Sequence, residues 1–265
     1  ASNNTAVGNK ALLSNTTGTR NVAVGSLALD ANTTANDNTV VGYDAGTANT
    51  TGEKNVVVGT YAFDANTTGS FNTVVGRAAL SANTTADHNT AIGYQALDLN
   101  TTGTQNTAVG SGALDANTTA SNNTAVGYLA ATLVTTGANN LALGRTALST
   151  ASTGSANTAV GKDALAALTT SDNNTALGKS AGVSVTTGEQ NTLLGQVSAG
   201  SLTTGDDNIA IGHDAADNLT SGQQNIAIGV DTSLSAADGA NQIVMGQNVT
   251  CTGNDNFTFG NGTTD

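Results

Sequence analysis

The sequence predicts an all-β fold, a parallel β-solenoid (β-roll) in which each coil takes seventeen residues. Three observations predict it: a repeat of constant length, a glycine at one fixed place in every repeat, and short apolar stretches separated by turn-forming residues. A compact globule would need more large side chains, since only 3% of residues are aromatic. Disorder is also disfavoured, because the chain has no proline and only 10% charged residues, whereas disordered chains are rich in both.

Each repeat begins with asparagine, and we number the positions of a unit from this residue. Fourteen units follow one another without insertion or deletion, and with a short N-terminal lead-in they fill residues 1–241. A fifteenth unit begins at Gln242 and is shortened, because its successor begins at Asn256. We therefore expect residues 242–265 to form shortened terminal coils that lead into a downstream region missing from this segment.

The fifth position is glycine in every unit. Such uniformity indicates a backbone that no Cβ can follow, because of a positive φ or the close approach of a neighbouring strand. The fifteenth position is usually glycine, but Ala35, Ala86, Ala120 and Ser171 show that this second turn does not require it. The first six fifth-position glycines, which we expect to form a structural ladder, are Gly8, Gly25, Gly42, Gly59, Gly76 and Gly93.

The second to fourth positions form a short strand in which the third side chain points away from the other two. The fourth position is Val, Ile or Leu in all fourteen units, so we expect it to face the interior of the coil. The third position, which is never polar, then forms an outward apolar stripe of roughly 700 Å² along a rod of roughly 70 Å. We expect other copies of the chain to cover it. The interface residues would include Val40, Val57, Val74 and Leu193.

Two columns of asparagine are expected to stack along the solenoid. First-position asparagines can bond to one another and to turn backbone. The twelfth position is asparagine in the first seven units, from Asn15 to Asn117, and then becomes apolar, from Val134 to Ala236. We expect this second column to face inward, amide-bonded in the first half and dry in the second. The first six members of the first-position ladder are Asn4, Asn21, Asn38, Asn55, Asn72 and Asn89.

The repeats resemble those of two known groups of fibrous proteins. Units such as NTAVGYLA (Asn123 to Ala130), each followed by a Thr-Thr turn, resemble the repeats of phage tail fibres. Strands such as NTAIG (Asn89 to Gly93) are similar to the shorter head repeats of trimeric autotransporter adhesins, and the end, NQIVMGQNVTCTGNDNFTFGNGTTD, resembles the segment that often precedes a tail-fibre chaperone. The resemblance covers nearly the whole chain. It implies a parallel β-roll of three chains that serves as a shaft or attachment surface.

Residues that carry chemistry are sparse, so we expect no enzyme, no catalytic residue, no metal and no cofactor. His88 and His213 fall at different repeat positions and are expected to be solvated, and Cys251 has no second cysteine with which to pair. The net charge is −12, and every basic residue lies at or before Lys179, which disfavours nucleic acid as a partner. No apolar run approaches the ~20 residues of a membrane span, so membrane insertion is not expected.

These features predict a structural protein: a rigid rod in a phage tail fibre on the virion surface, which supports attachment to the host. Its main partner would be the chain itself, as a homotrimer. A host or cell-surface receptor, such as a glycan, would be bound by regions outside this segment, because specificity usually lies in loops that break a repeat.

Two alternatives remain open. One is the head of a bacterial surface adhesin, exposed on the cell. The chain also has features of a monomeric binding solenoid of the ice-binding type, because of its Thr-Thr pairs, although adjacent threonines point to opposite sides of a strand and only one row can face outward. A sugar-cleaving solenoid would need paired carboxylates, and the repeat displays no distinctive pair.

Overall fold

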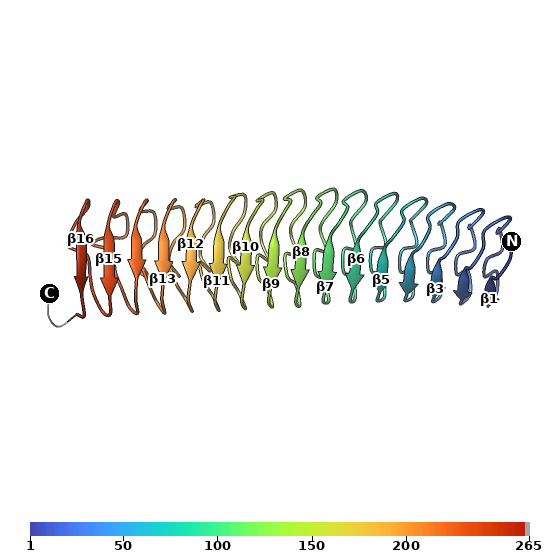
Figure 1. The fold of residues 1–265 in the computed structure, drawn as a ribbon, viewed down its shortest axis with the longest axis horizontal. Helices are drawn as coiled ribbons and strands as arrows, with labels where there is room; N and C mark the ends of the chain where they lie inside the picture. Colours follow the sequence, from blue (N-terminus) through green and yellow to red (C-terminus); the bar gives the residue numbers. More distant parts are fainter. Residues whose placement is uncertain (263–265) are drawn as a thin grey trace. The chain divides into compact units, whose positions relative to one another are not determined.

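The computed structural model describes residues 1–262 and confirms the predicted fold class, a parallel β-solenoid. The chain divides into two compact units, Ala1–Thr136 with strands β1 to β8 and Gly137–Asp265 with strands β9 to β16. Within each unit consecutive strands lie side by side, as Figure 1 shows. Residues 263–265, which end the predicted terminal coils, lie outside the described residues.

The strands of the first unit follow the predicted second to fourth positions of each repeat. They are β1 (Thr5–Val7), β2 (Val22–Val24), β3 (Thr39–Val41), β4 (Val56–Val58), β5 (Thr73–Val75), β6 (Thr90–Ile92), β7 (Thr107–Val109) and β8 (Thr124–Val126). Each residue pairs with the one seventeen places later, as Thr5 does with Val22, so equivalent residues stack in register.

The second unit continues the same pattern as far as its shortened coil. Its strands are β9 (Leu141–Leu143), β10 (Thr158–Val160), β11 (Thr175–Leu177), β12 (Thr192–Leu194), β13 (Ile209–Ile211), β14 (Ile226–Ile228), β15 (Ile243–Gly246) and β16 (Phe257–Gly260). β15 pairs with β14 in the seventeen-residue register, whereas Ile243 pairs with Phe257, fourteen residues on, because the coil between them is shorter.

The third strand position faces the interior of the coil, which reverses the prediction from the sequence. Val40, Val57, Val74 and Leu193 are no more than 1% exposed within their own chain, so they are core residues and not interface residues. The second and fourth positions point outward instead. The physical reason is the width of the coil. Its interior accepts mainly alanine at the third and eighth positions, and the larger Val, Ile and Leu side chains of the fourth position lie outside.

The interior is packed by exchange of volume between neighbouring coils. Leu193 is large for a third-position residue, and its Cδ1 atom lies where a side chain on Gly182 would be. At Gly182, glycine at the ninth position, where leucine is common, makes room for this large third-position side chain, as close packing requires.

The first-position asparagines join each coil to the next. The side-chain oxygen of Asn21 accepts a hydrogen bond from the backbone N–H of Asn38 at 3.0 Å, and its amide donates to the carbonyl of Ala35 at 2.8 Å. The same two bonds recur at Asn38, Asn55 and Asn89. Asparagine thus satisfies backbone groups at the start of a strand and at the second turn, which explains its uniform use.

The fifth-position glycines form the corner that follows each strand. Gly76 has φ of 141°, and an added Cβ would collide with the carbonyl oxygen of Gly93 in the next coil. Three further corners place non-glycine residues in the left-handed region, as Asp44, Leu80 and His88 illustrate with φ of 51°, 50° and 60°. A backbone bond to an adjacent coil holds each of them, such as that from Leu80 N–H to Ala96 O at 2.9 Å.

The twelfth position is an interior column in both units. Asn32, Asn66 and Asn117 are fully buried in the first half, and Leu168 and Leu202 are fully buried in the second. The column ends before Ala236, which is exposed; in that unit Leu234, two positions earlier, is buried instead. The interior therefore changes from amide to hydrocarbon without a change of backbone register.

Candidate interaction surface

In each unit, the outward side of the strands carries two parallel columns of side chains, at the second and fourth strand positions. We call this surface the outer sheet face. The second column is threonine or a large aliphatic residue up to β15, and the fourth is Val, Ile or Leu up to β14. None of these side chains is buried in β1 to β15. Val58 is 38% exposed, Leu177 46% and Leu194 40%, so the face offers apolar area to a partner.

The outer sheet face carries no charged residue in any of the sixteen strands. The acids of the chain fall in the turns instead, and so do the lysines and arginines, at the sixth, seventh and seventeenth positions. With a net charge of −12, the remaining surface repels a second acidic chain, but the outer sheet face does not.

Aromatic and basic side chains occupy the turns that precede and follow the strands of the first unit. The rings of Phe71 and His88 stack with centroids 4.9 Å apart, and Lys54 Nζ lies 4.8 Å from the Phe71 ring centroid. Arg77 lies 5.7 Å from the ring centroid of Tyr94, which is 48% exposed. These contacts run between neighbouring coils, so the turns add lateral support along the stack.

The Thr-Thr pairs form one outward row and one row that is tied to the backbone. The hydroxyl of Thr67 donates to the carbonyl of Thr84 in the next coil at 3.0 Å, whereas Thr68 is exposed. The same bond recurs from Thr16, Thr50 and Thr101. A single exposed hydroxyl row matches the prediction that only one member of each pair faces outward.

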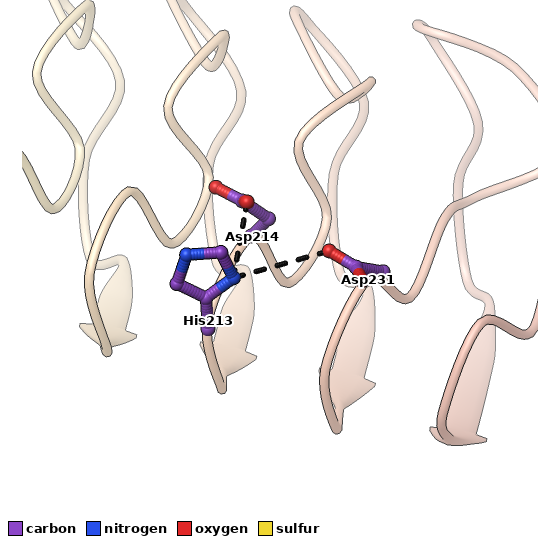
Figure 2. Close-up of side chains that lie close together, drawn as sticks. All are labelled: His213, Asp214 and Asp231. Atoms are coloured by element: carbon purple, nitrogen blue, oxygen red, sulfur yellow. Dashed lines mark ion pairs between the residues drawn. The ribbon is translucent and has the colours of Figure 1, made fainter.

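A histidine and two carboxylates meet on the second unit. Asp214 and Asp231 are equivalent residues of adjacent coils, and Figure 2 shows both carboxylates directed toward the His213 ring. His213 Nδ1 lies 3.0 Å from Asp214 Oδ2 and 3.9 Å from Asp231 Oδ1. Their ligand atoms lie within 4.8 Å of one another, close enough to share a cation. The same geometry makes a surface ion pair when the imidazole is protonated, so it assigns no function.

The structure does not bring the other candidate groups together. His88 stacks on Phe71 in the first unit, whereas Cys251 is buried in the terminal coil of the second, with its sulfur 3.5 Å from the hydroxyl oxygen of Thr258. Tenth-position acids are partly buried, and burial raises the pKa of Asp64 and Asp115 above the usual value. These carboxylates lie along one column with Asp98, whose charge further raises the pKa of Asp115.

The sequence pattern led to the wrong prediction for the outer sheet face, because it placed the fourth strand position inside the coil and the third outside. Strict alternation correctly separated the third position from the second and fourth, but it could not say which side was the interior. A signal was present in the sizes of the side chains: the third and eighth positions are mostly alanine, whereas the fourth is always larger. A narrow solenoid interior favours the smaller set.

Comparison with known proteins gives no relative for this chain. No family model, no curated protein and no solved structure matches it. Among residues 1–262, the structure has no helix with the length and apolar character that a bilayer span requires. The function must therefore be argued from the solenoid itself.

Proposed function

We propose that this chain is a structural segment of a surface fibre, which holds an attachment element away from a virion or cell. The observation that carries the proposal is the unbroken register of the repeat: within β1 to β8 and within β9 to β15, paired strands join residues that are seventeen apart. No full unit carries an insertion that would form a specific binding loop.

Hydrogen bonding along the stack supports a mechanical role. Strand backbone, first-position asparagines and Thr-Thr hydroxyls all bond to the next coil, so bending one coil against its neighbour disturbs several bonds together. Repeated bonding of this kind also protects backbone from proteases, which suits an exposed fibre. The resemblance to tail-fibre repeats favours a phage fibre of three chains, with receptor binding by regions outside this segment.

Small-angle X-ray scattering of the purified chain tests the proposal. A fibre segment should scatter as a stiff rod of roughly 70 Å, from the ~4.8 Å rise of each coil. Limited proteolysis should leave the repeat region intact over the time in which an unfolded control is digested. A compact particle, or a flexible one cut rapidly within the repeats, would contradict the structural role.

A further inference from the structure

We propose that His213, Asp214 and Asp231 form a binding site for one divalent transition-metal ion, such as Zn²⁺. The proposal goes beyond the structural role and does not depend on it. The three side chains come from two adjacent coils of the second unit and converge on one point (Figure 2). Their distances alone fit an ion pair as well as a cation, so the case for a metal depends on the register, the backbone, the ligand set and the local charge.

The seventeen-residue register brings the three ligands together. Strands β13 and β14 pair residues that are seventeen apart, so Asp214 and Asp231 occupy the seventh position of consecutive coils, beside His213 at the sixth. No other two consecutive units both carry an acid at the seventh position. The third ligand is distant along the chain and adjacent only in the solenoid, so the local sequence around His213 predicts no metal.

Backbone hydrogen bonds fix the positions from which the ligands project. The N–H of Asp231 donates to the carbonyl of His213 at 3.0 Å, which joins the two coils within the site itself. The N–H of Asp214 donates in the same way to the carbonyl of Gln196 in the preceding coil, at 3.1 Å. Both aspartates have a left-handed backbone, with φ of 50° and 52°, so they stand at equivalent corners. Ligands on a rigid backbone lose less conformational entropy when an ion binds.

The ligand set suits a transition metal. Zn²⁺ binds imidazole nitrogen and carboxylate oxygen at ~2.0–2.2 Å, which places its ligand atoms roughly 3–4 Å apart. His213 Nδ1 lies 3.0 Å from Asp214 Oδ2 and 3.9 Å from Asp231 Oδ1, so small side-chain rotations admit an ion between them. A nitrogen ligand favours Zn²⁺, Ni²⁺ or Cu²⁺ over Ca²⁺ and Mg²⁺, which take oxygen ligands. His213 and Asp231 are exposed, so water can complete the coordination.

The charge of the site favours a cation, as a comparison with another coil of the same unit shows. Lys162 and Asp163 occupy the sixth and seventh positions there, and Lys162 Nζ lies 3.3 Å from Asp163 Oδ2, so a cation is built into the pair. In the proposed site His213 replaces the lysine, and two carboxylates face it in place of one. No lysine or arginine occurs in either coil of the site or later in the chain. A bound metal ion would supply the missing positive charge.

Calorimetric titration with ZnCl₂ tests the proposal, with the whole untagged chain at about pH 8, where protons compete weakly for the ligands. We expect one ion per chain. His213→Gln and Asp231→Asn each remove a ligand and should weaken binding at least about tenfold. His88→Gln and Asp163→Asn are matched controls, because they remove the other histidine and a seventh-position carboxylate outside the site. Circular dichroism checks that each variant is folded, and Asp214→Asn replaces a ligand variant that is not.

Two further measurements identify the ligands and the effect of the ion. One equivalent of Cu²⁺ should give an electron paramagnetic resonance spectrum with nitrogen hyperfine coupling that is lost in His213→Gln. Because the ion joins two coils, saturating Zn²⁺ should raise the melting temperature of the unmodified chain and the controls, but not of the ligand variants. Absence of binding, or equal Zn²⁺ affinity in ligand and control variants, would overturn the proposal. Ca²⁺ binding as tight as that of Zn²⁺, and unchanged by His213→Gln, would also overturn it.

Discussion

The residues of the twelfth-position column are polar in the first seven units and apolar in the later ones, although the coils that contain them are alike. In the first seven units it is a ladder of amides: Asn66 donates to the side-chain oxygen of Asn49 at 2.7 Å and accepts from Asn83 at 2.9 Å. In the second half it is a dry stack that includes Leu168 and Leu202. A buried column can thus be polar or apolar, provided that each member suits its neighbours above and below.

The amide ladder ends at the junction between the two columns. Asn117 donates to Asn100 at 2.7 Å, but the next member of the column is Val134. Among residues 1–262, three buried polar side-chain atoms lack a hydrogen-bond partner: the side-chain oxygens of Asn117 and Asn32 and the hydroxyl of Thr232. The oxygen of Asn32 shows that the ladder is also interrupted before Asn49, although both neighbours there are asparagines. The ladder therefore ends in an unsatisfied acceptor, and an orphan of this kind costs about 1–3 kcal/mol.

The largest effect is expected from a charge in the dry column. Leu168→Asp loses the packing of a buried leucine, about 2–5 kcal/mol, and also buries a carboxylate with no partner in the column. We expect the free energy of unfolding to fall by at least about 4 kcal/mol, measured by urea denaturation. Thr170→Asp, on an exposed residue of the same coil, should change it by less than about 0.5 kcal/mol. Similar losses for the two variants would contradict the interior placement of Leu168.

Removing an amide should cost more in the middle of the ladder than at its end. Asn66→Val leaves the side-chain oxygen of Asn49 and the backbone N–H of Gly69 without partners. We expect a loss of about 2–4 kcal/mol, because each orphaned group costs about 1–3 kcal/mol. Asn117→Val orphans only the oxygen of Asn100 and removes the existing orphan, so its loss should be below about 1 kcal/mol. Equal denaturation midpoints for the two variants would show that the amides act independently.

Extending the ladder by one coil should be nearly neutral. In Val134→Asn the new amide can donate to the unsatisfied oxygen of Asn117, while its own oxygen becomes the new end of the ladder. We expect a change in unfolding free energy within about 1 kcal/mol. Val185→Asn has apolar Leu168 and Leu202 as column neighbours, so it should lose about 2–3 kcal/mol. Thermal denaturation of both variants decides whether the position of the junction matters.

Much of this architecture could be predicted from the sequence, because the repeat itself compares positions. The strand at the second to fourth positions, the corner at glycines such as Gly76 and the inward twelfth-position column follow from which residues each place accepts. The sequence pattern did not predict which face of the strand lies inside the coil, because alternation of side chains is the same whichever face is buried. The left-handed corners at Asp44, Leu80 and His88 also escaped prediction, because cross-coil hydrogen bonds and not local sequence stabilise them.

The smallest expected effects on stability come from two carboxylates, and these effects have opposite signs in the two units. Burial raises the pKa of Asp64 in the first unit, whereas the hydroxyl of Thr146 lowers the pKa of Asp163 in the second. A raised folded-state pKa favours the folded chain below the unfolded value of 3.8, and this advantage is lost as the pH rises through the folded pKa. A lowered one favours the folded chain above 3.8, and the advantage is lost as the pH falls through the folded pKa.

Neutral asparagine at each site should therefore give opposite results at pH 7. We expect Asp64→Asn to raise the melting temperature and Asp163→Asn to lower it, each by no more than about 2 °C, because both groups are partly exposed and screened. Near pH 3 the effect of Asp64→Asn should disappear, since the aspartic acid is then itself neutral. The effect of Asp163→Asn should shrink as its carboxylate is protonated. Calorimetric scans at both pH values would contradict this assignment if the two variants shifted in the same direction at pH 7.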